Sequence, residues 1–172
     1  MLIKRLIKRL IHCSGVAFMA LSILTLAGCG FTLQGSYSVP KELSQLTLSS
    51  PDQYSELTRL VRERLRLNSV KLVDAADTIP TLRLLNDSLE RSTLSLYPTG
   101  KVAEYELIYH VRFAVTLPEK EAQPFDIEIR RDYLDDPRTA LAKSREMELL
   151  VKEMRVQAAD KIIQTLAAIE VN

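Results

Sequence analysis

The sequence contains few of the residues that stabilise small exported domains or build common catalytic centres. Its 172 residues include two cysteines, two histidines, five glycines and no tryptophan. Both cysteines, Cys13 and Cys29, lie near the N-terminus, so the rest of the chain has neither a disulfide framework nor a cysteine-based metal site. The glycines form no phosphate-binding loop. The body of the protein is therefore expected to depend on its hydrophobic core.

A strong excess of charge of either sign is also missing. The chain has 23 Lys and Arg residues against 22 Asp and Glu residues, a formal net charge of +1. Four of the cations lie in the first nine residues, and without residues 1–28 the balance is 19 against 22, a net charge of −3. Nucleic-acid-binding domains usually carry a basic face, and a balance this near neutrality predicts no nucleic-acid partner.

The N-terminus has the pattern of a secretory signal peptide. Its basic start is followed by an apolar run over residues 11–26, shorter than the about 20 residues of a membrane-spanning helix. The run ends in Leu26-Ala27-Gly28-Cys29, which resembles the lipobox of bacterial lipoproteins. That resemblance implies cleavage of residues 1–28 before Cys29. A plain secretory cleavage near Ala27 is the alternative.

The lipobox resemblance also implies a covalent diacylglycerol on the Cys29 sulfur and an N-acyl chain on its amino group. No cofactor is predicted besides these acyl chains. Each buried methylene contributes about 0.8 kcal/mol, so several acyl chains hold a protein stably on a bilayer. Residue 30 is glycine and not the aspartate that favours inner-membrane retention. The implied location is the periplasmic side of the outer membrane, anchored in its inner leaflet. Residues 29–42 are expected to form the lipidated N-terminus and a linker.

The remaining residues, 43–172, are enough for one domain with its own core. Alternating or apolar runs predict strands near residues 43–48, 70–72, 81–96, 103–117 and 125–133, with the second parallel to the first and a turn at 98–101. The run from Ala103 to Leu117 alternates most clearly, which predicts one buried and one polar face.

Two helices are predicted beside these strands. Ser50-Pro51-Asp52-Gln53 resembles a capping box and predicts a helix from about Pro51 to Leu67. Asp135-Asp136-Pro137 predicts the start of a second helix, whose apolar residues recur every three or four positions to Ile169. At about 1.5 Å per helical residue and 3.3 Å per strand residue, this helix and the 103–117 strand have similar lengths. We therefore predict an α/β two-layer sandwich: a mixed, mostly antiparallel sheet of about four strands with two helices packed on one face.

Candidates for catalysis are few. His110 is the only histidine after residue 28, and it shares the polar face of its predicted strand with Glu104 and Glu106. These two acids lie about 7 Å apart on a strand, a spacing that could hold an acid pair. No pocket-forming loop accompanies them, so a solvent-exposed strand face is the preferred interpretation. The chain is predicted not to be an enzyme, and a hydrolase is the least favoured hypothesis.

Basic clusters offer a second kind of site. They could face anionic lipid headgroups or sugars, although such runs more often form the solvated side of an element. Their residues are Arg59, Arg62, Arg64 and Arg66, and Arg130 and Arg131. From the residues alone, the hypothesis is a lipid-tethered periplasmic domain whose function is binding. A free-standing lipoprotein that binds a small ligand is the alternative function.

Several segments match, in order, the motifs of one family. They are Cys29-Gly30-Phe31-x-Leu33, Leu65-Arg66-Leu67-Asn68-x-Val70, Gly100-x-x-Ala103-Glu104-Tyr105 and Asp136-Pro137-x-x-Ala140-Leu141-Ala142-Lys143, followed by Lys152-Glu153-Met154. On these motifs the chain resembles the LptE family of lipopolysaccharide-assembly lipoproteins. The resemblance implies a two-layer domain that plugs and helps assemble the LptD β-barrel in the outer membrane. Together the two proteins would form the translocon that inserts lipopolysaccharide into the outer leaflet.

The resemblance also implies that the chain binds lipopolysaccharide through two basic positions. One is the lysine of the Ala-Leu-Ala-Lys segment, Lys143. The other is an arginine two residues before the glycine of the strand turn, a position that Pro98 occupies in this sequence. Either Lys101, just past the turn, takes its place, or the chain binds lipopolysaccharide less strongly and acts mainly as plug and assembly aid.

Overall fold

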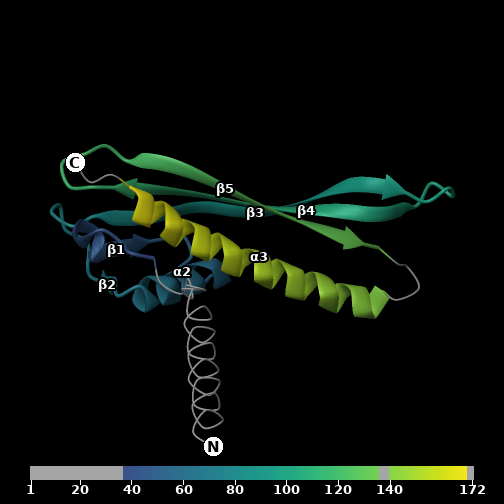
Figure 1. Ribbon diagram of the computed structural model, residues 1–172, viewed down its shortest axis with the longest axis horizontal. Coiled ribbons are helices and arrows are strands. Elements are labelled where there is room, and N and C mark those ends of the chain that lie inside the picture. Colours follow the sequence, from purple (N-terminus) through teal and green to yellow (C-terminus); the bar gives the residue numbers. More distant parts are fainter. Residues whose placement is uncertain (1–36, 136–139, 170–172) are drawn as a thin grey trace, which may run out of the picture. The chain divides into compact units, whose positions relative to one another are not determined.

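Two helices lie on the same side of one sheet in the computed structural model, which describes residues 37–135 and 140–169 (Figure 1). The elements are η1 (Lys41–Leu43), β1 (Gln45–Ser49), α2 (Glu56–Leu67), β2 (Lys71–Leu72), β3 (Thr81–Leu96), β4 (Val102–Thr116), β5 (Gln123–Leu134) and α3 (Ala140–Ala168). This arrangement confirms the predicted two-layer α/β sandwich.

The sheet has five strands in the order β2-β1-β3-β4-β5, where the sequence predicted about four. β1 pairs in parallel with β2 and with the start of β3, and β3, β4 and β5 pair antiparallel. The shortest strand is β2, which has two residues and corresponds to the strand predicted near residues 70–72. Its pairing with β1 confirms the predicted parallel crossover through the first helix.

β4 supplies the sheet side of the core. Phe113 is fully buried and stacks on Phe125 of β5, with 5.2 Å between the ring centroids. The helix side comes from one stripe of α3, in which Ala158 and Ala159 are also fully buried. Most of the core belongs to these two elements, as the following buried residues show: Leu107, Tyr109, Val111 and Val115 of β4, and Met154, Ile162, Ile163 and Leu166 of α3. The predicted buried face of the 103–117 strand is confirmed.

Along β3, the even-numbered side chains do not always point to the same face of the sheet. Leu82 and Leu84 are buried and pair with Val115 and Phe113 of β4. Register shifts at Leu84/Asn86 and Thr93/Ser95 mark β-bulges. An extra residue changes which side chains point to which face. Between these two bulges, the odd-numbered residues from Asp87 to Thr93 therefore face the helices.

The first helix begins later than the sequence predicted. Ser55, not Ser50, is its N-cap, and the Ser55 Oγ accepts a hydrogen bond from the Thr58 backbone N–H at 3.1 Å. The predicted capping box instead forms a turn, because the Asp52 carboxylate accepts the Tyr54 N–H at 2.8 Å. The buried Thr58 hydroxyl donates to this turn at the Asp52 carbonyl. The helix ends at Leu67, as predicted, and Asn68 follows as its C-cap.

α2 and α3 are joined by two ion pairs, Arg64 with Asp160 and Arg155 with Glu56, each at 2.5 Å. Within residues 37–135 and 140–169, neither helix has the length and apolar character needed to cross a membrane. The residues expected to cap α3 at 136 and 137 lie outside the described ranges.

The predicted linker is described only from Tyr37 onward. The Tyr37 N–H donates to the Asn68 side chain at 2.7 Å, and the Gln164 amide donates to the Tyr37 hydroxyl at 2.5 Å. Tyr37 and Val39 also pack against the core. This part of the segment therefore contacts the body of the domain, while the domain boundaries themselves stay predictions.

Replacing Phe113 with alanine is expected to lower the free energy of unfolding by about 3–5 kcal/mol, because the change removes a buried ring and leaves a cavity against Phe125. Urea unfolding followed by circular dichroism measures the effect. Arg83→Ala, on the exposed face of β3, is the control and is expected to stay within about 0.5 kcal/mol of the parent. Equal losses in the two variants would contradict the assigned core.

Candidate functional site

One end of the domain combines the two predicted lysine positions. We call it the hairpin end and define it as the turn between β3 and β4, the end of β5 and the first turn of α3, which lie at the same end in Figure 1. Two hydrogen bonds hold it together: the Asp135 N–H donates to the Ala103 carbonyl at 2.9 Å, and the Tyr97 hydroxyl donates to the Asp135 carbonyl at 3.4 Å.

Lys143 lies in the first turns of α3 and is held by its neighbours. Its Nζ is 2.7 Å from a Glu146 carboxylate oxygen and 5.2 Å from the centre of the Tyr133 ring. The Tyr133 hydroxyl donates to the Lys143 carbonyl at 3.0 Å. The side chain is 17% exposed, so its neighbours cover most of it. These contacts fix the position of the charge.

Lys101 completes the turn that follows Pro98. The Tyr97 N–H donates to the Lys101 carbonyl and the Gly100 N–H donates to the Tyr97 carbonyl, both at 2.8 Å. Gly100 has a φ of +79°, a conformation that side chains with a Cβ rarely adopt. Lys101 is exposed at the tip of the hairpin. The structure thus brings both predicted lysines to the hairpin end.

The sequence analysis missed the exposed apolar residues of this end. Leu141 in the first turn of α3 is 70% exposed. The others are Leu94, Leu96, Tyr97 and Leu134. Alternation alone counted Leu94 and Leu96 as ordinary strand residues. The position of Leu94 and Leu96 next to the turn at residues 98–101 is the sequence signal that could have identified them.

Exposed apolar side chains next to cations can bind an amphipathic anion. Lysine presents a point charge to phosphate or carboxylate, while leucine side chains accept acyl chains. Arg91 adds a further cation to the neighbouring part of β3, with its guanidinium 4.2 Å from the centre of the Tyr105 ring. Arginine in this position can also form paired hydrogen bonds with phosphate. The hairpin end has the chemistry of a site for a phosphorylated lipid.

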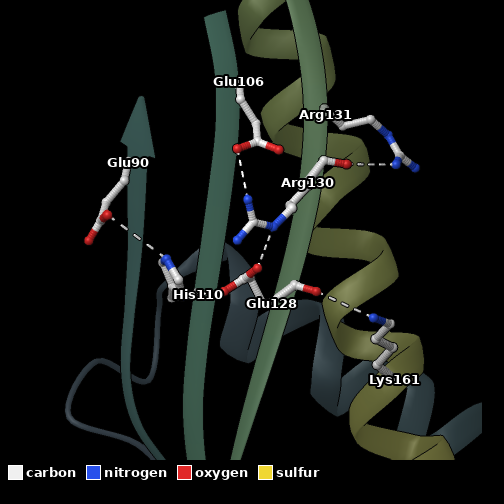
Figure 2. A network of polar contacts seen from close by, with 7 residues as sticks. All are labelled: Glu90, Glu106, His110, Glu128, Arg130, Arg131 and Lys161. Carbon is white, nitrogen blue, oxygen red and sulfur yellow. Dashed lines mark hydrogen bonds and ion pairs between the residues drawn. The ribbon is translucent and has the colours of Figure 1, made fainter. Parts of the chain in front are cut away.

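The candidate catalytic residues lie on the polar face of the sheet, away from the helices, and Figure 2 shows two of them, Glu106 and His110, with their partners. Glu106 accepts a hydrogen bond from Arg130 at 2.8 Å. Glu104 accepts one from Ser95, also at 2.8 Å. His110 lies 3.6 Å from Glu128 and 4.0 Å from Glu90. The geometry therefore places the two acids in separate pairs, and the prediction that the chain is not an enzyme stays a prediction.

The arginine clusters differ in their surroundings. Arg64 pairs with Asp160, and Arg130 pairs with Glu106 and Glu128, whose hydrogen bonds raise the pKa of Arg130. Three other arginines of α2 line a surface groove of about 410 Å³, together with Leu60, Glu63 and Leu67. They are Arg59, Arg62 and Arg66. Among the described residues, no group of three or more His, Cys, Asp or Glu side chains could hold a metal ion.

A small-ligand pocket beneath the helices would have favoured a free-standing binding protein. The side chains that α3 directs there are fully buried from Met154 to Leu166. A groove of about 500 Å³ does run along the first half of α3, and its lining includes Met147, Val151 and Arg155. It lies at the surface of the helix. The packing under the helices therefore gives that alternative no support.

A polar network connects β3 to both helices. The Tyr109 hydroxyl donates to the Asp87 carboxylate at 2.6 Å, and the Arg155 guanidinium lies 6.0 Å from the centre of the Tyr109 ring. Burial, followed by the hydrogen bond to Asp87, raises the pKa of Tyr109. Arg155 in turn pairs with Glu56 of α2. Cys29, the predicted lipid attachment site, lies outside the described residues.

Comparisons with known proteins give one consistent result. A family model named LptE and described as lipopolysaccharide-assembly matches residues 43–166. Proteins named LPS-assembly lipoprotein LptE from Yersinia pestis (strain Pestoides F) and Yersinia pseudotuberculosis serotype O:1b (strain IP 31758) are 42% identical over 153 residues. Each match covers 88% of this chain and 74% of the relative.

Solved structures agree with this result. The crystal structure of the rare lipoprotein B from Shewanella oneidensis is 81% identical, with a TM-score of 0.69, and the match covers 72% of this chain and 94% of that one. The solution structure of lipoprotein B from Nitrosomonas europaea is 25% identical, with a TM-score of 0.65, over 81% of this chain and 91% of that one.

The raised pKa of Tyr109 predicts a loss of stability in alkali. The folded state keeps the phenol protonated at pH values where the unfolded chain, with a tyrosine pKa of about 10, releases the proton. The protonated Tyr109 therefore contributes its full stabilisation of the folded state below about pH 10. Above about pH 10 the free energy of unfolding falls by up to about 1.4 kcal/mol per pH unit. Urea unfolding between pH 8 and pH 11 measures this slope.

Tyr109→Phe is expected to reduce the slope and to cost about 1 kcal/mol at pH 8, because the hydrogen bond to Asp87 is lost. Burial also raises the pKa of Tyr133, so part of the pH dependence is expected to remain in the variant. An unchanged slope in the variant would contradict the assignment to Tyr109.

Proposed function

The chain belongs to the LptE family of lipopolysaccharide-assembly proteins, and on that premise we propose that it plugs and helps assemble the LptD β-barrel and binds lipopolysaccharide. In this proposal it is anchored on the periplasmic side of the outer membrane by acyl chains on Cys29. Several acyl chains on one residue give stable anchoring. The anchor would keep the domain close to the barrel and raise its local concentration there.

The observation that carries the binding step is the position of Lys101 and Lys143 beside exposed leucines at the hairpin end. Lipopolysaccharide has phosphate groups on a lipid with acyl chains, so it needs cations and apolar contacts together. Lys143 corresponds to the basic residue of the family motif. The second basic position of the family motif is an arginine, and Pro98 stands there in this chain. Lys101 lies three residues later on the same turn and would supply the second charge.

The polar face of the sheet supports the role as a plug. Arg112, His110, Glu128 and Arg130 lie on this face, away from the helices. A barrel that spans the outer membrane has a polar lumen, because its apolar side chains point to lipid. A domain that presents ion pairs and hydrogen-bonding groups outward can occupy such a lumen without exposing its core.

The proposed complex predicts that the full-length, tagged chain co-purifies with a large β-barrel protein from detergent-solubilised outer membranes. Mass spectrometry identifies the partner, and LptD is the expected result. Cys29→Ala is the matched variant, and it is expected to lower the yield of the complex because the chain is no longer anchored. A wild-type chain that leaves the membrane alone and monomeric would contradict the proposal.

Charge reversal at the hairpin end tests lipopolysaccharide binding. Lys143→Glu and Lys101→Glu are each expected to weaken the affinity roughly tenfold, as the loss of one charge-assisted contact of about 1.5 kcal/mol predicts. Binding of purified protein to lipopolysaccharide is measured by surface plasmon resonance, with circular dichroism as the check of folding. Lys71→Glu, on β2 at the other end of the sheet, is the matched control. Equal affinities in all variants would remove both lysines from the site.

A further inference from the structure

Three arginines form a stripe along the outer surface of α2. Arg59, Arg62 and Arg66 follow one another at intervals of three and four residues, so they lie on one side of the helix and line the same groove of about 410 Å³. Arg62 donates to the Gln53 carbonyl at 3.5 Å. Glu63 is the one acid among the residues that line the groove, so its three cations leave a net charge of +2. We call Arg59, Arg62 and Arg66 the arginine stripe.

The stability of the domain does not account for this stripe. Arg64 of the same helix pairs with Asp160 of α3. Arg59 and Arg66 are exposed, and within residues 37–135 and 140–169 neither side chain has an ion pair or a hydrogen bond. The helix macrodipole favours Arg66, in the last turn, but not Arg59, in the first half of α2. The stripe is therefore available to an anion.

The N-terminal tether enters the domain beside the end of this stripe. Tyr37, the first described residue, donates its N–H to the side chain of Asn68, the C-cap of α2, at 2.7 Å. Asn68 follows Arg66 by two residues. The eight residues from Cys29 to Tyr37 span at most about 28 Å. The acyl chains proposed for Cys29 would therefore keep the end of α2 within about that distance of a membrane surface.

We propose that the arginine stripe docks the domain on anionic phospholipid headgroups of the leaflet that holds its acyl chains. A guanidinium group can donate two parallel hydrogen bonds to a phosphate, and it is more weakly hydrated than the ammonium group of lysine. Leu67, 61% exposed at the end of the helix, would reach the boundary between headgroups and acyl chains. The inference rests on the proposed function, because it needs the acyl anchor.

The tether makes this modest charge sufficient. Each cation near an anionic surface strengthens attachment about fivefold, which corresponds to about 1 kcal/mol, so the net charge of +2 gives about thirtyfold. A domain free in solution would bind weakly at this level, whereas a short linker holds it at a millimolar effective concentration. Because the Debye length is about 8 Å at physiological salt, only charges held this close to the headgroups contribute.

The docked position is compatible with a domain that plugs a barrel. β3 has 16 residues and extends about 53 Å, roughly twice the 25 Å apolar band of an outer-membrane barrel. A domain that enters with its hairpin end therefore leaves its other half on the periplasmic side. α2 lies in that half, because it pairs with Arg155 and Asp160 in the second half of α3 (Figure 1). The stripe would meet the bilayer next to the barrel rim.

Other occupants fit the stripe less well. Residues 30–36 contain no charged side chain, so the tether itself brings no acid to the arginines. A second copy of the chain that docks through the same face would place like charges opposite each other, which costs free energy. An acidic partner protein would bind without any membrane, and its binding would not depend on the lipid composition of a vesicle.

Fluorescence quenching in vesicles tests the docking. The full-length chain, acylated in cells, carries a fluorophore at Leu67→Cys and is incorporated into vesicles whose headgroups bear a quencher. Strong quenching is expected with phosphatidylglycerol and much weaker quenching with phosphatidylcholine alone. The signal is expected to recover at about 1 M salt, where the Debye length is about 3 Å. A fluorophore at Asp126→Cys, exposed on β5, is the control and is expected to stay unquenched.

Arginine substitutions give a second readout. Arg59→Gln with Arg66→Gln is expected to lower the ratio of docked to undocked chains about thirtyfold, as the loss of two cations at about fivefold each predicts. Arg83→Gln with Arg145→Gln removes the same charge from exposed positions elsewhere, and it is expected to change the ratio by less than about twofold. Circular dichroism checks the folding of each variant.

Flotation of the vesicles separates failure of the docking from failure of the anchor. If the wild-type chain floats with both kinds of vesicle but is quenched equally, or not at all, in the two lipids, the inference is wrong and the proposed anchor stands. The same conclusion follows if the variant without Arg59 and Arg66 docks like the parent. If the chain floats with neither kind of vesicle, the anchor is wrong and the inference falls with it.

Discussion

The fold depends on covering one apolar face of β4 with one stripe of α3. Both surfaces are fully buried around Phe113 and Ala158. Burial of apolar surface contributes roughly 25 cal/mol per Å², and with no cysteine among the described residues no disulfide supplements it there. The covering is incomplete, because the helices bury β3 only at Leu82 and Leu84. The helices leave the remainder of β3 and the turn at Gly100 exposed, and this turn is part of the proposed lipopolysaccharide site.

The polar face of the sheet contributes less to stability than its number of contacts suggests. Arg130 is 53% exposed while it pairs with Glu106 and Glu128. Exposed ion pairs typically contribute about 0–1 kcal/mol, because water screens them and the side chains lose conformational freedom. What the pairs provide is a face on which opposite charges are matched. Such a face suits contact with another polar surface more than catalysis by a free acid.

The sequence predicted the elements whose pattern is regular and failed where two local patterns compete. The alternation from Ala103 to Leu117 predicted β4 and its buried face, since no bulge interrupts the register of β4 with β5. Ser50 to Gln53 has the residues of a capping box, but the Asp52 turn with the buried Thr58 hydroxyl is the structure that forms. Sequence spacing could not distinguish these two uses of the same residues.

The candidate site was predictable only in part. The family motif identified Lys143, but its contact with Tyr133 joins β5 to α3 and can be seen only in the fold. The middle of β3 is polar, and a fixed period of two continued from Leu82 and Leu84 places Ser88 and Glu90 in the core. The bulge after Leu84 shifts the phase and places Leu89 on the helix side. A bulge has no sequence signal here, so the position of Leu89 on the helix side could not be predicted.

Two adjacent alanines of α3 set how closely the helix packs on the sheet. Ala158 and Ala159 are fully buried, so a larger side chain at either position would have to tilt the helix away from its support. Lys143 lies fifteen residues before Ala158, or about 22 Å along the axis. If the helix tilts by a few degrees at Ala158, the ammonium group of Lys143 therefore moves by about one to two ångströms. A shift of this size is enough to break a hydrogen bond. The small side chains of Ala158 and Ala159 in the core thus determine where the charge of Lys143 lies.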